Sequence, residues 1–422
     1  MATSKDSSLL NILDDRLHIP VENGISHSHP RRKPSHDITR ASKRTHKKIF
    51  SKRKRNRSLL RRTWTLPFGL VLIVLLLYMI SPTESNIFHH FLFLSYRLED
   101  DVSTMQYGKG PWDFAFVCFY TVVLTFAREF LMQEILRPLA RFCGIKSRSK
   151  QSRFLEQMYV VVYVAFMGPF GLYCMKQTPV WYFNTRGMYE FFPHRTHDAE
   201  LKFYYLFQAA FWSQQALVML LGMEEKRKDY QELVAHHFVT IALIGLSYRF
   251  HFTYMGIAVY ISHDISDFFL AMSKSLNYIG SPLQGPSFGF CIVMWTYLRH
   301  YINLRILYSI LTEFSTVGPY GIDWETQQYK GLISQTITFV LLAALQLLNL
   351  FWLYCLLRNA YRFIFLGIAK DDRSEDEEPE HDTKEPRIEN NDKIGEMSSS
   401  KSTETHGLAV KRRGTAKKHS AL

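Results

Sequence analysis

Long apolar runs alternate with short polar connections through the middle of this 422-residue chain. A helix that crosses a bilayer needs about 20 mostly apolar residues. The runs that approach this length predict eight membrane-spanning helices, at residues 65–82, 112–132, 157–175, 202–222, 232–249, 253–272, 287–311 and 332–357. We therefore predict an all-α, polytopic integral membrane protein whose helices form one bundle.

The connections between these runs predict the side of the membrane that each one faces. Loop 133–156 and the segment "MEEKRKDYQ" at 223–231 are rich in Lys and Arg, whereas 83–111 and 312–331 carry few and include "LEDD" and "GIDWE". Basic loops tend to remain in the cytosol. Because the number of spans is even, both chain ends are then predicted to be cytosolic.

Composition separates the ends of the chain from its middle. The hydrophobic fraction of 47% is high for a chain with a net charge of +13, because polar ends flank the apolar runs. We predict a basic, disordered cytosolic arm at 1–64, a first span with its lumenal loop at 65–111, a catalytic membrane domain at 112–362, and an acidic, Ser-rich disordered tail at 363–422. Ser374, in "DRSEDEE", is a candidate phosphorylation site.

Two features argue against other classes of protein. The basic run "KKIFSKRKRNRSLLRR" directly precedes the first apolar run, so it is interpreted as an orientation signal at anionic lipid headgroups and not as a nucleic-acid site. The five cysteines are scattered without a C-x-x-C pair, which favours neither a disulfide framework nor a zinc site.

Ionisable residues interrupt the fifth and sixth apolar runs. His236 and His237 lie about one turn into the fifth, and His263, Asp264 and Asp267 lie in the half of the sixth that is predicted to be cytosolic. Successive helix residues are 100° apart, so the last three fit one polar stripe. Charges within a span are costly and usually face a cavity or a partner. Two histidines opposite two carboxylates predict an acid–base site.

Two simpler interpretations of these ionisable residues explain less of the pattern. A single intramembrane histidine often does no more than bond a neighbouring helix, but five ionisable groups on adjacent helices exceed that need. Histidine and aspartate also bind zinc or iron. A membrane di-iron enzyme needs several H-x-x-x-H and H-x-x-H-H boxes, which this chain lacks, so no metal is expected.

The stretch "DYQELVAHHFVTIALIGLSYRFHFTYMGIAVYISHDISDFFLAMSKSLNY" resembles the Lag-type motif of ceramide synthases, within a TLC membrane domain. The paired histidines, the His-Asp-x-x-Asp and the following Lys274 all agree with that motif. The resemblance extends over about 150 to 360 and includes "WTYLRHYIN" and "LQLLNLFWLYCLLR". The basic arm and acidic tail resemble the fungal branch, and no homeobox-like insert is present.

This resemblance implies transfer of a fatty acyl group from acyl-CoA to the amine of sphinganine or phytosphingosine, which forms dihydroceramide or phytoceramide. It implies residence in the endoplasmic reticulum membrane and a very-long-chain acyl preference. It also implies a small single-span accessory subunit and homo- or hetero-dimerisation with a paralogue. Acyl-CoA is a substrate, and no cofactor is expected.

Two routes fit the same residues. In one, His236 or His237 is the general base while the amine attacks the thioester. In the other, an imidazole attacks first and an acyl-histidine then acylates the amine. Asp264 and Asp267 are candidates to orient the imidazole or hold the substrate ammonium. An oxyanion donor is also required, and no sequence motif points to one.

Further polar residues are candidates for substrate binding. They lie in the other apolar runs or beside the predicted cytosolic face, where acyl-CoA phosphates would approach. The set is Gln214, Gln215, Lys274, Arg299, Asn349, Arg227 and Lys228. A non-catalytic TLC-domain protein that binds, transports or senses lipid is the alternative, although such a protein has no need of paired acid–base groups.

Overall fold

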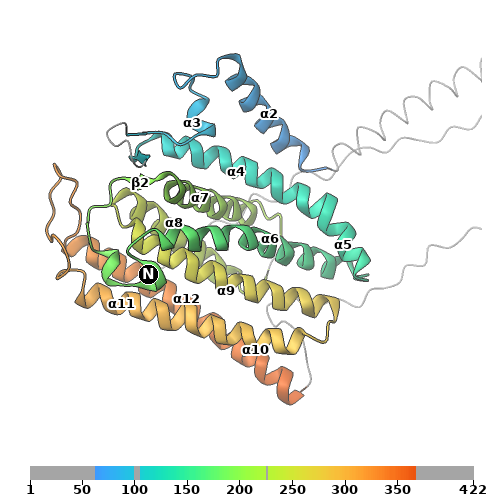
Figure 1. Cartoon of the computed structure of the whole chain (residues 1–422). Helices are drawn as coiled ribbons and strands as arrows, with labels where there is room; N and C mark the ends of the chain where they lie inside the picture. Colours follow the sequence, from blue (N-terminus) through green and yellow to red (C-terminus); the bar gives the residue numbers. More distant parts are fainter. Residues whose placement is uncertain (1–61, 99–104, 225–226, 367–422) are drawn as a thin grey trace, which may run out of the picture. The chain divides into compact units, whose positions relative to one another are not determined.

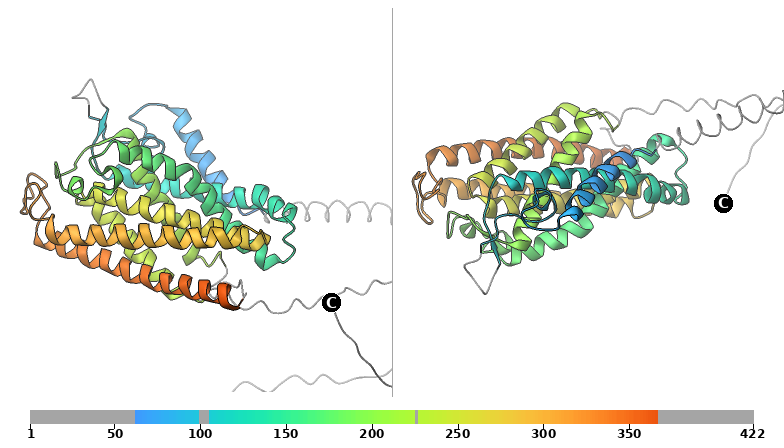
Figure 2. Two further views of the ribbon diagram at one scale, coloured as in Figure 1. Left: turned by 60° about the horizontal axis from the view of Figure 1, so that its bottom comes forward. Right: turned by 90° about the horizontal axis from the view of Figure 1, so that it is seen from above.

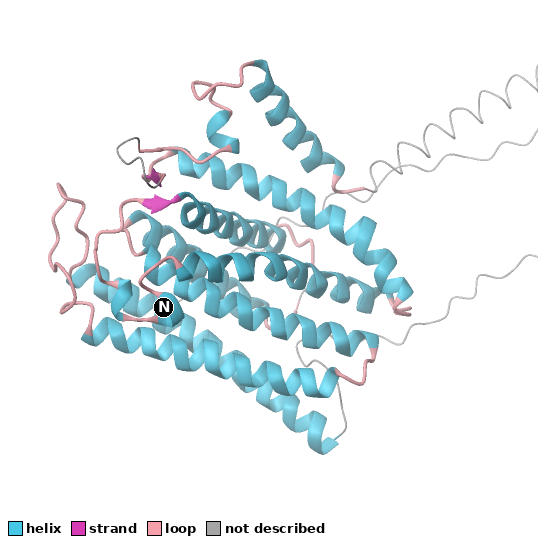
Figure 3. Cartoon of the chain, in the orientation of Figure 1, coloured by secondary structure: helices cyan, strands magenta, loops and turns pink. Residues whose placement is uncertain are grey.

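The computed structural model of this chain describes residues 62–98, 105–224 and 227–366, which belong to one compact unit (Figure 1). Most of the basic arm, nearly all of the acidic tail and Ser374 lie outside the described residues. The described chain is almost entirely helical, and the strands in it are two short antiparallel segments, β1 (Gln106–Tyr107) and β2 (His197–Asp198) (Figure 3). The predicted all-helical class is confirmed.

Each predicted apolar run coincides with a helical segment, except that the runs 65–82 and 202–222 extend two residues beyond the helix end. The helices that contain these runs are α2 (Thr65–Ile80), α4 (Trp112–Phe130), α6 (Arg148–Lys176), α7 (Ala199–Leu220), α8 (Tyr230–Arg249), α9 (Thr253–Ile279), α10 (Gln284–Trp295), α11 (Asn303–Thr312) and α12 (Leu332–Leu366). The short helices are α3 (His89–Leu92), α5 (Arg137–Phe142), η2 (Trp181–Phe183) and η3 (Arg186–Met188). The apolar runs therefore predicted where the helices lie, because an apolar segment in a bilayer must satisfy its backbone hydrogen bonds internally and so forms a helix.

Two π-helical segments join helices of the bundle, and the first continues beyond the predicted end of its run at residue 132. Segment η1 (Leu131–Leu136) joins α4 to α5, and η4 (Thr296–Ile302) joins α10 to α11. A π-helical turn widens the helix locally and is often found at functional sites. Arg299 lies in η4 and is 2% exposed, so this wider turn carries a guanidinium in the bundle interior.

Helix α9 lies at the centre of the bundle. It packs against α6, α10, α8 and η4, while α8 and α12 pack on each other (Figure 2). It ends at Gly280, whose φ of +73° is the left-handed conformation that glycine adopts at little cost. Helix α2 packs on α4, at the edge of the bundle. The polar motif of α9 is therefore enclosed on several sides.

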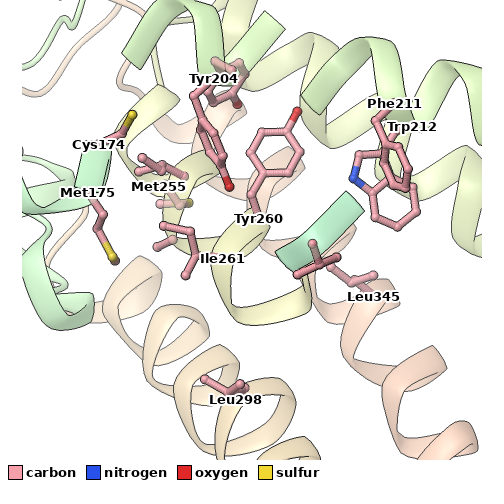
Figure 4. Packing of buried hydrophobic residues seen from close by; sticks show 14 of the residues in the cluster. Cys174, Met175, Tyr204, Phe211, Trp212, Met255, Tyr260, Ile261, Leu298 and Leu345 are labelled. Atoms are coloured by element: carbon pink, nitrogen blue, oxygen red, sulfur yellow. The ribbon is translucent and has the colours of Figure 1, made fainter. Parts of the chain in front are cut away.

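The core is built from aromatic and aliphatic side chains of α6, α7, α9, α11 and α12. Figure 4 shows part of it, with Tyr204 and Trp212 of α7 near Tyr260 of α9. Gly256 lies against Tyr205, and a Cβ at Gly256 would collide with that ring. The lack of a side chain at Gly256 thus allows α7 and α9 to approach closely.

Three helical stretches of the described residues are long and apolar enough to cross a membrane, namely 112–142, 148–176 and 332–366, and α2 is apolar but shorter. The central helices are less apolar because they carry buried polar side chains, among them Lys202, Gln208 and Asp264. Of the eight predicted spans, those that carry the polar motif are therefore helical but less apolar than these three stretches.

The predicted lumenal end of the bundle is closed by buried polar groups. His251 follows α8 and stacks on Tyr329, with ring centroids 5.7 Å apart, and Lys109 lies 3.3 Å from its Nδ1. Burial, reinforced by the Lys109 charge, lowers the pKa of His251 to about 4. The ring is therefore neutral at physiological pH, and its Nδ1 accepts a hydrogen bond from Lys109.

Candidate active site

His236 and His237 lie near the start of α8 and are 5% and 7% exposed. Nδ1 of His237 lies 2.9 Å from the backbone carbonyl one turn earlier, so Nδ1 donates and Nε2 keeps its lone pair. Nδ1 of His236 is buried without a hydrogen-bond partner among the described residues, and Nε2 is 3.5 Å from the Thr240 hydroxyl. The His236 ring packs edge-on against Trp212 and Trp352, with centroids 5.6 and 5.2 Å away.

His263 of α9 is held at both ring nitrogens. Its Nδ1 lies 2.9 Å from the carbonyl oxygen of Val259, and its Nε2 lies 3.1 Å from the amide nitrogen of Asn349 on α12. Nδ1 therefore carries the proton, and Nε2 accepts a hydrogen bond. Both ring nitrogens of His263 are thus hydrogen-bonded, and the residue links α9 to α12 beside the site. His236, in contrast, keeps one ring nitrogen without a hydrogen-bond partner among the described residues.

The Asp264 side chain is hydrogen-bonded to α7. The side-chain amide of Gln208 donates to the Asp264 carboxylate, and the Tyr163 hydroxyl donates to the Gln208 carbonyl oxygen over 3.0 Å. Gln208 is fully buried and Asp264 is 3% exposed. A buried carboxylate needs hydrogen-bond donors to remain charged, and here Gln208 provides one while it fixes the carboxylate orientation.

Asp267 forms an ion pair with Arg299 of η4, at 2.6 Å. The same guanidinium donates to the Ser266 hydroxyl over 2.6 Å and to the Asn349 side chain over 3.1 Å. It also lies 4.1 Å from the centroid of the Trp295 ring. Arg299 therefore joins η4, α9 and α12, and it compensates the charge of Asp267 inside the bundle.

Two cavities approach this cluster from opposite sides. The first, called here the apolar tunnel, runs between α8, α9 and α12 towards the loop before α12, and its wall includes Ile244, Ser247, Val259, Trp324, Tyr329, Thr338, Leu342 and Leu345. The second, called the polar cavity, opens beside Glu224 and Arg227 and also includes Glu156, Gln215, His237, Asp267, Lys274 and Arg299. Among the described residues, three line both: Trp212, His236 and Asp264.

The predicted site residues divide among these places. Those that line the polar cavity are His236, His237, Asp264, Asp267, Gln215, Lys274, Arg299 and Arg227. His263 lines the apolar tunnel, and Asn349 supports His263 and Arg299 from behind. Gln214 is fully buried outside the lining of both cavities, and Lys228 is exposed and also outside it. The expectation that Gln214 and Asn349 line the cavity was therefore wrong.

Sequence reasoning did not identify two residues at the centre of the site. Gln208 holds Asp264, and Trp212 packs on His236 at the junction of the cavities. A signal was present, because Gln208, Trp212 and Gln215 recur at i, i+4 and i+7 and so share one helix face. Gln214, one residue from Gln215, points about 100° away from it.

Comparison with known proteins agrees with this geometry. The TLC domain matches residues 153–358, which include every residue of the polar motif. The protein FUM17 of Gibberella moniliformis, described as sphingosine N-acyltransferase-like, is 56% identical over 328 residues, which cover 76% of this chain and 84% of that protein. This chain belongs to the ceramide synthase family.

Two further members of the ceramide synthase family support this assignment. Ceramide synthase LAG1 of Saccharomyces cerevisiae is 48% identical over 322 residues, or 76% of this chain and 78% of that protein. Sphingosine N-acyltransferase lac1 of Schizosaccharomyces pombe is 43% identical over 331 residues, or 78% and 85%. The predicted resemblance to the fungal branch of the ceramide synthase family is confirmed.

Proposed function

We propose that this protein is a ceramide synthase that transfers a fatty acyl group from acyl-CoA to the amine of a sphingoid base. The observation that carries the proposal is the junction of an apolar tunnel with a polar cavity at His236. An acyl-CoA has the same division, with an apolar chain, a reactive thioester and an anionic nucleotide. Its thioester would lie at His236 when its two ends occupy the two cavities.

The proposed substrates fit the charge and length of the cavities. Arg227 and Lys274 of the polar cavity are candidate partners for the phosphates of CoA. Along α12 the tunnel wall reaches from Ile333 to Leu345, so it extends roughly 18 Å at about 1.5 Å per residue. That length fits a long fatty acyl chain, and the very-long-chain preference implied by the family resemblance stays a prediction. The thioester is already activated, so the reaction needs no cofactor.

The test of this function is an amide-forming assay in microsomes. Membranes that contain the protein are given sphinganine or phytosphingosine and acyl-CoAs of different chain length, and the products are identified by mass spectrometry. Dihydroceramide or phytoceramide should form only when both substrates are present. Binding of both lipids without amide formation would instead favour a TLC-domain protein that carries or senses lipids.

We expect an acyl-enzyme on His236. An Nε2–H directed at Thr240 leaves the Nδ1 lone pair for attack on the thioester, and neighbouring His237 offers Nε2 as a base for the incoming amine. Protein mixed with acyl-CoA alone should therefore release one CoA per site and gain the mass of the acyl chain. Intact-protein mass spectrometry after rapid quenching measures this gain. Strict dependence of CoA release on added sphinganine, with no adduct, would favour direct attack by the amine.

The arrangement in the membrane is also part of the proposal. Eight spans, with the basic N-terminal arm and the acidic tail in the cytosol of the endoplasmic reticulum, are supported by the basic loop 223–231 beside the polar cavity. Acyl-CoA would then reach the site from the cytosol.

Protease added to sealed microsomes should digest both tails and leave a tag at 312–331 intact. After detergent opens the vesicles, the protease should cut the tag, which shows that the tag is cleavable once the protease reaches it. Protection of either tail in sealed vesicles would refute the eight-span arrangement.

A small single-span subunit, or a second copy or paralogue of this chain, is proposed as a membrane partner. Helix α2 supports this idea because α4 is the long helix on which it mainly packs in the part of the chain that the structure describes, and its apolar side chains stay exposed, with Leu66 at 74% and Ile80 at 78%. Lipid tails can cover such a surface as well. Co-purification before and after replacement of these side chains would separate the two cases.

A further inference from the structure

Acyl transfer requires a hydrogen-bond donor for the negative charge that develops on the carbonyl oxygen. That donor must lie where the thioester lies, at the junction of the apolar tunnel and the polar cavity. The described side chains that line both cavities are Trp212, His236 and Asp264. His236 is the attacking group in the proposed function, and the Asp264 carboxyl group accepts a hydrogen bond from Gln208, so it is placed as an acceptor that orients an imidazole. Trp212 is the third of these residues, and its indole N–H can donate a hydrogen bond but cannot accept one.

The surroundings of Trp212 place it well for this role. Its ring centroid is 5.6 Å from that of His236, and the rings meet edge-on, at 69°. The residue is 9% exposed, and its Nε1 is buried without a hydrogen-bond partner among the described residues. Figure 4 shows the nitrogen-bearing edge of the indole turned towards the side where Tyr260, a residue of the tunnel wall, lies. A buried donor without a partner is rare in folded proteins, and a substrate oxygen would satisfy it.

We propose that the indole N–H of Trp212 is an oxyanion donor of the acyl-transfer reaction, an inference that rests on the proposed function.

A lone pair of His236 forms a bond to the thioester carbonyl carbon, and the carbonyl π electrons move to oxygen, where Trp212 donates its hydrogen bond. When the carbonyl bond re-forms, the carbon–sulfur bond breaks and CoA leaves as thiolate. The thiolate takes the proton that the acylated imidazole loses. The amine then attacks the acyl-imidazole through a second oxyanion at the same place. Nε2 of His237 takes the proton of the amine and passes it to the departing imidazole.

Two other buried donors in the cavities lack this placement. Nε1 of Trp295 and the hydroxyl of Tyr260 also have no hydrogen-bond partner among the described residues. Trp295 lines the polar cavity alone, where its ring lies under Arg299. Tyr260 lines the tunnel alone, one turn before Asp264 on α9. An oxygen at the junction would therefore meet Trp212 first.

The test removes the N–H and keeps the shape of the ring. Trp212 is replaced by β-(3-benzothienyl)alanine, in which sulfur takes the place of the indole N–H, through suppression of an amber codon in the full-length protein. The same replacement at Trp181, which is 48% exposed in η2 at the opposite end of the bundle, is the matched control. Trp212→Phe is made in parallel. For each protein, kcat, KM for acyl-CoA and the melting temperature in detergent are measured.

The benzothienyl variant at residue 212 should lose about 100-fold or more in kcat, the effect of removing one oxyanion donor. Its KM and melting temperature should stay close to those of the wild type. If Trp212 served only in packing, its replacement would change these two quantities instead. The Trp181 control should keep full activity. A kcat within about threefold of the wild type, or a loss confined to KM or to the melting temperature, would overturn the role of Trp212. Absence of amide formation by the wild type would overturn the proposed function itself, so the two failures are distinct.

Discussion

Replacement of His236 with alanine is expected to lower amide formation by about 1,000-fold or more, because the reaction loses its attacking or proton-accepting group. The ring lies at the junction of the apolar tunnel and the polar cavity, and its Nδ1 has no competing hydrogen bond among the described residues. His237→Ala and Asp264→Ala should also abolish the reaction while the protein stays in the membrane. The measurement is product formation at equal protein levels in microsomes.

His251→Asn is the matched control for this experiment. His251 is a buried histidine as well, but it lies outside the lining of both cavities, at the far end of α8. Its φ of +68° is a conformation that asparagine tolerates, so the replacement should fold and keep its activity. Normal activity of all three site variants, at wild-type protein levels, would eliminate the proposed mechanism.

A tryptophan at Thr338 is expected to shift the acyl preference towards shorter chains. Thr338 lies in the tunnel wall on α12, between the level of His236 and the predicted lumenal loop. A large ring there would obstruct the far part of the tunnel and leave the near part open. The ratio of C26 to C16 product should fall on the order of 100-fold, since steric exclusion acts on the longer substrate alone.

The matched control lies two residues earlier on the same helix. Thr336 is exposed on the outer side of α12 and does not line either cavity, so Thr336→Trp should leave the product ratio unchanged. Both variants are given an equimolar mixture of acyl-CoAs, and the chain lengths of the products are compared. If Thr338→Trp lowers all products equally, the tunnel does not hold the acyl chain as proposed.

Arg299 shows how much of the site can be predicted from the sequence pattern. A lone arginine in an apolar run predicts a functional or paired cation, and the structure pairs it with Asp267. The partner was on another helix, 32 positions away in sequence, and the π-helical turn that carries Arg299 has no apolar periodicity to reveal it. The sequence therefore named Arg299 only as a candidate substrate-binding residue, and packing decided that it pairs with Asp267.

The two histidine motifs show a second limit. Sequence grouped His263 with Asp264 and Asp267 because all three fit one sector of a helix. In the bundle their side chains reach α12, α7 and η4 respectively, since α9 is surrounded by other helices. A 100° sector that looks like one polar stripe on an isolated helix can thus face three neighbours. Both ring nitrogens of His263 are hydrogen-bonded, whereas the ring of His236 lines both cavities and has one nitrogen without a partner among the described residues.

The sequence by itself determined where the helices lie, which two of them carry the ionisable motif, and which family the chain belongs to. Apolar length and a short motif are local properties, so they can be read one segment at a time. The tertiary structure alone decided that Gln208 and Trp212 complete the site, that Gln214 and Lys228 lie outside it, and that the junction of the cavities is at His236. These outcomes depend on the rotation of each helix about its axis, which is fixed by the packing of all its neighbours together and not by its own residues.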